Sequence, residues 1–283
     1  MNKVRKNRAT PVWVMLSSNF DAWMRSPRTT IMLISIVLLC YLEVANTFQT
    51  YASFGIAVNW VETPFLFMAY GVNILMSSIM FFITISEIPR KLSFQNYMLI
   101  RSNRRKWLFS QILYCVGMVC AMLLIMTLCI LLFSYPYAAH GRGWSDLTRI
   151  QEGLVVETQT LVPQYVLHTY TPFMGMLYAM LPVFAFWLTL AMIILVTSLF
   201  NMPFVGLLLD ASIILSGFIL MFANDVYLPI QFSILQYLNP DNNGPEFYRY
   251  TMLGYVLLNA AMVSAMYVRI SNSDLVFSSD NKF

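Results

Sequence analysis

Six apolar runs dominate this chain, and their length limits how it can fold. They cover residues 29–48, 64–85, 108–133, 172–200, 203–222 and 250–268. A helix rises about 1.5 Å per residue, so about 20 residues span the roughly 30 Å of hydrocarbon in a bilayer. Helices also give each backbone polar group the internal partner that hydrocarbon cannot supply. We therefore expect an all-α polytopic membrane protein, with six transmembrane helices in a single membrane domain over residues 1–283.

The composition excludes an ordinary soluble domain. Hydrophobic residues make up 59% of the chain and charged residues only 11%, whereas soluble domains carry roughly a quarter charged residues. All four cysteines fall inside apolar runs, without the spacing of metal ligands. We interpret them as reduced packing residues. They are Cys40, Cys115, Cys120 and Cys129.

The basic residues gather on one side of the six predicted spans. Of 17 lysines and arginines, only Arg142, Arg149 and Arg249 fall in the segments that this topology places outside. Cytoplasmic loops carry an excess of basic residues. We therefore expect both termini in the cytoplasm (N-in/C-in) and a multi-pass protein of the cell (plasma) membrane. This distribution explains the net charge of +4, and no basic face remains for nucleic acid.

An amphipathic segment precedes the first span. Trp13, Leu16, Phe20 and Trp23 recur at three- and four-residue spacing, which is typical of one helix face. We predict an interfacial helix over 10–25 that lies along the inner membrane surface. An amphipathic helix packed on another protein domain is the alternative.

Two further segments lie outside the six spans. An outer loop over 135–171 holds both histidines, His140 and His168, which we interpret as surface residues rather than metal ligands. A short helix after Ser145 is expected in this loop. The apolar stretch 226–238 reaches only about 20 Å as a helix, too short to cross, so we predict an outer re-entrant segment between spans five and six.

The chain contains no catalytic or nucleotide-binding signature. A zinc-binding HExxH, a GxSxG nucleophile turn and a phosphate-binding GxxxxGK[ST] are all missing from the sequence. We therefore expect no enzyme activity, cofactor or metal site in this chain.

Two acids fall within predicted spans, where a buried charge is costly and marks a functional candidate. Glu43 lies about 21 Å beyond the inner start of its span, near the outer surface, and Asp210 about 10 Å from the inner surface. Glu43 can snorkel to the outer edge. Asp210 either bonds to neighbouring hydroxyls or lines a cytosol-facing cavity. Both are candidates for a pathway or cavity, and we expect no pairing between them.

The segments, taken in order, resemble the membrane subunits of ABC-2 type transporters, which share the type V exporter-like fold. Three stretches carry the resemblance. The first is the interfacial helix at 11–25, and the second is the segment 86–106, with an acid, a short helix and a basic exit. The third is the hairpin 190–215, followed by the apolar 226–238 and Asn239-Pro240. The segment 86–106, the connector between spans two and three, lacks the glycine and proline that family members often carry before the basic exit. The outer loop is longer than the family's usual turn.

The resemblance implies the permease subunit of an ATP-driven exporter whose cargo is a peptide, a lipid or an amphipathic small molecule. Two permease subunits, identical or different, would sit among membrane lipids on two copies of a separate ABC ATPase that holds ATP and Mg. A cytosolic coupling helix at 90–101, between spans two and three, would dock on that ATPase, and Glu87 would brace it against basic residues of the N-terminal helix. The coupling residues would be Glu87, Arg90, Lys91, Phe94, Tyr97 and Arg101. An inner-surface anchor would follow at Arg104, Arg105, Lys106 and Trp107, although retention of positive charge inside explains its three bases without a partner.

Two other classes stay open. An ion-coupled secondary carrier is expected to have charges near the membrane midplane and repeated halves. Of these features, the sequence offers only the two charges Glu43 and Asp210. A non-transporting scaffold or sensor would use the outer loop at 135–171.

Overall fold

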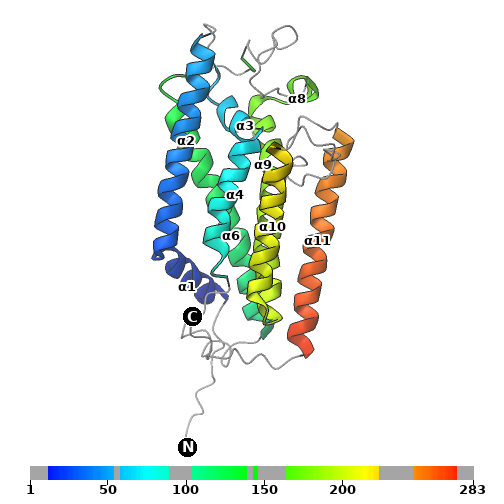
Figure 1. The fold of residues 1–283 in the computed structure, drawn as a ribbon. Coiled ribbons are helices and arrows are strands. Elements are labelled where there is room, and N and C mark those ends of the chain that lie inside the picture. The colour runs from blue at the N-terminus through cyan, green and yellow to red at the C-terminus, as the bar shows by residue number, and fades with distance from the viewer. Residues whose placement is uncertain are drawn as a thin grey trace, which may run out of the picture.

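The computed structural model describes residues 12–53, 58–69, 71–88, 104–138, 143–145, 164–222 and 245–272. These residues form helices that run side by side in an elongated bundle (Figure 1). The helices are α1 (Val12–Met24), α2 (Pro27–Ser53), α3 (Glu62–Ala69), α4 (Gly71–Ile85), α6 (Arg104–Ser134), α8 (Gln164–Thr169), α9 (Pro172–Leu199), α10 (Pro203–Phe222) and α11 (Pro245–Asn272).

Four of these helices, α2, α6, α9 and α11, are long and apolar enough to cross a bilayer. The pair α3 and α4 adds a fifth crossing if its two halves count as one span, and α10 contains a shorter apolar stretch over Pro203–Gly217. Such a set of helices is that of a multi-pass membrane protein. The all-helical expectation holds throughout the residues described.

Helix α9 occupies the centre of the bundle. It packs against α3, α4, α6, α10 and α11. Within its apolar 18-residue stretch 67% is buried, compared with 11% in the corresponding stretch of α11. An apolar side chain on every face suits a helix surrounded by other helices. The exposed apolar side chains of α2 and α11 instead point away from the bundle, where a lipid environment accommodates them.

The predicted single span at 64–85 is broken in the structure. Helices α3 and α4 meet at an angle of 77°, and α3 lies at the end of the bundle opposite α1 (Figure 1). The Asn73 amide donates to the Phe67 carbonyl oxygen at 3.4 Å, which satisfies an acceptor that the break removes from the helical ladder. The apolar pattern does not reveal this break, because both halves are strongly hydrophobic.

The hairpin of α9 and α10 matches its predicted bounds closely. Asn201 adopts a φ of 60° between the two helices, a conformation that asparagine tolerates better than most residues, and Pro203 opens α10. Pro182 lies inside α9, which continues through it. Helix α11 begins earlier and ends later than the predicted 250–268.

Several predictions fall outside the described residues. They include the coupling helix at 90–101, the re-entrant segment at 226–238 and the short helix expected after Ser145. Of the loop at 135–171, the structure describes its two ends and residues 143–145, with α8 near the second end.

Candidate functional site

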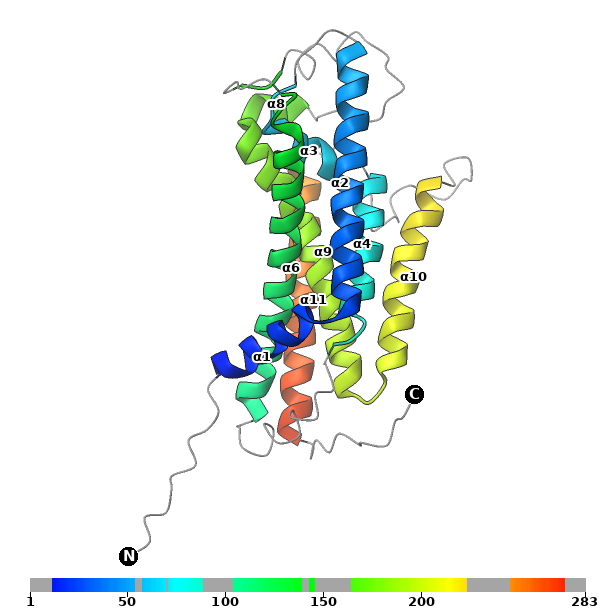
Figure 2. The same ribbon diagram turned by 90° about the vertical axis from the view of Figure 1, so that its left-hand side faces the viewer.

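The candidate site lies where α1, α2, α4 and α6 meet, which we call the α1 end of the bundle. Helix α1 runs across the bundle there instead of along it (Figure 2). Phe20 meets the Tyr114 ring edge-on with a centroid distance of 5.2 Å. A Cβ atom at position 117 would lie 2.6 Å from Phe20 Cζ, so Gly117 leaves the space that lets α1 pack against α6.

The buried face of α1 differs from the predicted stripe. Trp13 is 72% exposed, whereas Met15, Leu16, Asn19 and Trp23 are buried. Leu16 and Trp23 of the stripe thus face inward and Phe20 packs beside Gly117, while Met15 and Asn19 take the place of Trp13 on the buried face. Helix α1 therefore packs on the chain's own α6 with part of its predicted apolar face outward.

A tight elbow connects α1 to α2. The backbone N–H groups of Thr29 and Thr30 both donate to the Ser26 carbonyl oxygen, at 3.1 and 3.3 Å. Pro27 opens α2, a position where its missing N–H costs nothing. This elbow fixes Arg28 in the first turn of α2.

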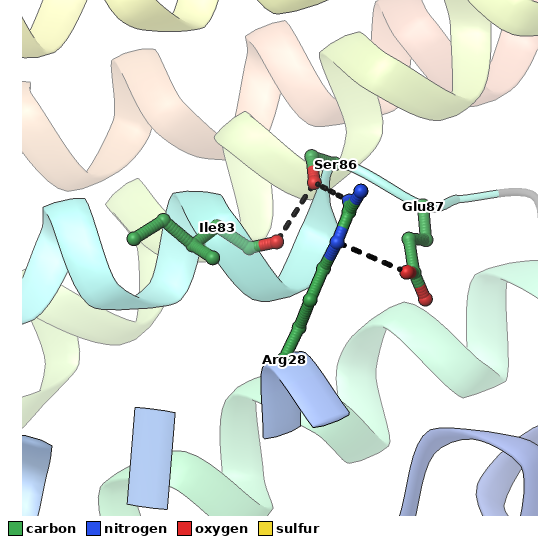
Figure 3. Close-up of polar contacts among 4 residues, drawn as sticks. All are labelled: Arg28, Ile83, Ser86 and Glu87. Carbon is green, nitrogen blue, oxygen red and sulfur yellow. Dashed lines mark hydrogen bonds and ion pairs between the residues drawn. The ribbon is translucent and has the colours of Figure 1, made fainter. Parts of the chain in front are cut away.

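Arg28 bridges from that turn to the end of α4, 58 residues further along the chain (Figure 3). Its Nε atom lies 3.2 Å from Glu87 Oε1, and its Nη1 atom donates to Ser86 Oγ at 2.9 Å. Ser86 Oγ in turn donates to the Ile83 carbonyl oxygen at 2.7 Å. One guanidinium thus holds both residues that follow α4.

The electrostatics explain why these charges pair. Arg28 stands at the positive N-terminal end of α2 and Glu87 beyond the negative C-terminal end of α4, so each charge is unfavourable next to its own helix dipole. Pairing the two charges offsets both of these unfavourable interactions. The side chains are 51% and 31% exposed, and an ion pair in that setting contributes only about 0–1 kcal/mol. Its importance is therefore geometric: it ties the α1–α2 elbow to the point where the chain leaves α4.

The basic start of α6 lies at the same end of the bundle. Arg104, Arg105 and Lys106 are exposed, and the Arg105 guanidinium stands 5.1 Å from the centroid of the Tyr267 ring of α11. Trp107 departs from the prediction of a surface anchor, because only 1% of it is exposed. Its indole packs inside the bundle, and of the four predicted anchor residues only the three bases are exposed.

Other predicted site residues are separate from this cluster. Arg90, Lys91, Phe94, Tyr97 and Arg101 lie outside the described residues.

Of the two intramembrane candidates, Glu43 is half-buried on α2, and Asp210 of α10 is completely buried. Neither Asp210 oxygen has a hydrogen-bond partner within the described part of the chain.

Sequence reasoning missed a polar cluster at the opposite end. Glu62, buried in the first turn of α3, accepts hydrogen bonds from the backbone N–H and the hydroxyl of Ser145. Asn59 Nδ2 donates to the Gly143 carbonyl at 2.8 Å, and Trp144 Nε1 donates to the Tyr170 carbonyl at 2.8 Å. These bonds fasten residues 143–145 to the bundle. The only local signal was an acid directly before Thr63-Pro64 in a polar connection.

No known protein family, curated protein or solved structure matches the chain. Within the described residues, no group of three or more histidine, cysteine, aspartate or glutamate side chains is placed to hold a metal ion.

Proposed function

We propose that this chain is the membrane-spanning permease subunit of an ATP-driven transporter of the ABC-2 type. The observation that carries the proposal is the bridge from Arg28 to Ser86 and Glu87. It joins the elbow of a transverse N-terminal helix to the start of the predicted coupling segment. A force applied to that segment would reach α1, α2 and α4 together as a rigid-body movement.

The proposed topology has six crossings, with both termini in the cytoplasm. They are α2, the bent pair α3 and α4, α6, α9, α10 and α11. The bases Arg25, Arg28, Arg104 and Arg269 belong to helix ends that lie at the α1 end of the bundle (Figure 1). An excess of bases there supports a cytoplasmic α1 end.

In this proposal, ATP hydrolysis takes place on a separate subunit. Two copies of an ATPase bind ATP and Mg, and the segment 90–101 of each of two permease subunits docks on them. Closure of the ATPase pair pushes the segment, and the Arg28 bridge passes the displacement to the elbow. The cargo class is a peptide, a lipid or an amphipathic small molecule.

Copurification tests the proposal. The tagged chain, extracted from its native membrane in mild detergent, is expected to retain an ATPase subunit. Deletion of the gene is expected to abolish export of, or resistance to, an amphipathic compound. A Phe94→Ala/Tyr97→Ala variant is the diagnostic: it should insert normally but lose the ATPase. A chain that retains no ATPase, with no export defect on deletion, contradicts the proposal.

One observation favours a second candidate, an ion-coupled secondary carrier. Asp210 is buried without a hydrogen-bond partner in the described residues, as expected for a coupling acid within a membrane. Transport that continues after the ATPase is inactivated would support the carrier.

A further inference from the structure

Asp210 occupies an unusual environment for a carboxyl group. Its exposed fraction is 0%, and both side-chain oxygens lack a hydrogen-bond partner in the described part of the chain. A buried ionised carboxylate without a partner is strongly disfavoured, and such a group is either neutralised or bound to a counter-ion.

The helices packed against α10 offer no counter-ion. Gly206, Asp210 and Ile214 are buried at four-residue spacing, which places them on one face of α10. That helix packs chiefly against α9 and α4. Neither α9 nor α4 contains a charged residue or a histidine. Their one titratable side chain is Tyr178, and its ring stacks on Tyr248 at the other end of α9.

Charged groups at the α1 end belong to other contacts. The Arg269 guanidinium lies 5.3 Å from the centroid of the Phe200 ring, at the turn before α10. Arg28 pairs with Glu87 beyond the end of α4. Asp210 lies seven residues into α10, about 10 Å along its axis from Pro203. The opposite face of α10 exposes Val205, Leu208 and Leu209, and its exposed serines, Ser212 and Ser216, donate to backbone carbonyls of α10 itself.

The packing of α10 holds the carboxyl in place. A side chain at Gly206 would overlap Thr197 Oγ1, so the backbone of α10 approaches α9 closely one turn before Asp210. The short turn at Asn201 fixes the same end of the hairpin. In this packing the Asp210 side chain has no exposed surface.

We propose that Asp210 is a proton-binding site that keeps α10 packed against α4 and α9. The carboxyl is held as the neutral acid in the conformation described. Its proton dissociates to water only when α10 separates from its neighbours, so proton occupancy and helix packing are linked. The inference does not depend on an ATPase partner, and it is tested on the purified chain alone.

Infrared spectroscopy of the full chain in lipid nanodiscs tests the site directly. At neutral pH we expect the carbonyl stretch of a protonated carboxyl group, shifted when the protein is grown on isotope-labelled aspartate. The band should vanish in Asp210→Asn and persist in Asp21→Asn, which removes an exposed acid on α1. Absence of an aspartate-derived band in the wild-type chain overturns the proposal, whether or not any variant folds.

Thermal unfolding supplies the second measurement. Because the folded chain holds a proton that the unfolded chain releases, wild-type stability should fall as pH rises from mildly acidic to mildly alkaline. Asp210→Asn, which mimics the neutral acid, should lose that slope, and Asp21→Asn should keep it. Equal slopes in all three proteins contradict the proposal. Stability that instead depends on sodium or potassium at fixed pH assigns a cation site and likewise overturns it.

Discussion

At the scale of single residues, the Arg28 contact unites groups that are far apart in the chain. By analogy with the family that the connector resembles, Glu87 was expected to brace against a base of the N-terminal helix. The structure pairs it with Arg28, in the first turn of the next helix. Spacing along a sequence cannot select between Arg25 and Arg28, because the choice depends on how the elbow at Ser26 directs each side chain.

Charge reversal measures this contact. Arg28→Glu and Glu87→Arg should each lower thermal stability by about 1 kcal/mol or less, since each places like charges together at a partly exposed site. The double variant should recover the loss, because it restores the pair and places each charge at the helix end that favours it, with a coupling of about 0.2–1 kcal/mol in a double-mutant cycle. Arg25→Glu is the matched control, an exposed base three residues away. Zero coupling, with single variants no different from Arg25→Glu, would show that the bridge has no energetic role.

At the scale of helices, hydropathy located the elements well but not their breaks or faces. The predicted 203–222 coincides with α10, and 172–200 with α9 to within one residue. The bend between α3 and α4 escaped prediction because both halves are apolar, and the bond from the Asn73 amide to the Phe67 carbonyl at the bend leaves no mark in the hydropathy pattern. The exposure of Trp13 escaped prediction because spacing along α1 does not show how far α6, with Gly117 opposite Phe20, covers the helix.

Two glycines provide a matched test of helix packing. Gly206→Ala should destabilise the protein by about 1–3 kcal/mol, the usual cost of overpacking, because the new methyl group meets Thr197 of α9. Gly254→Ala on α11 has nothing within 4 Å of its new methyl group. It should be neutral or stabilise by up to about 1 kcal/mol through helix propensity. Reversible unfolding in detergent micelles compares the two. Equal effects would refute the close approach of α9 and α10.

At the scale of the whole molecule, the class of protein could be predicted but not the arrangement of its helices. All six runs are apolar, so nothing in the sequence marks α9 as the central helix or α11 as a peripheral one. The burial of α9 arises only when its neighbours assemble around it. The gathering of bases at one end of the bundle, by contrast, follows from their positions between the apolar runs, and the side of a bilayer that this end faces stays a prediction.

The bent pair α3 and α4 decides the number of crossings, and two positions can count them. Arg25 stands at the α1 end, and Tyr137, 72% exposed, follows the far end of α6. If the pair crosses the bilayer as one span, three crossings separate these residues and they face opposite sides. If it enters and leaves on one side, only two crossings remain and they face the same side. The Arg28–Glu87 contact requires the first case, because it returns the end of α4 to the start of α2.

Thiol labelling in intact cells distinguishes the two cases. Tyr137→Cys should react with a membrane-impermeant maleimide from outside, and Arg25→Cys only after the cells are permeabilised. The parent chain, without an added cysteine, gives the background level of labelling. Its four cysteines all lie within the apolar helices α2 and α6. Labelling of both variants without permeabilisation would mean that α3 and α4 do not cross together, and it would remove the cytoplasmic α1 end on which the proposed ATPase docking depends.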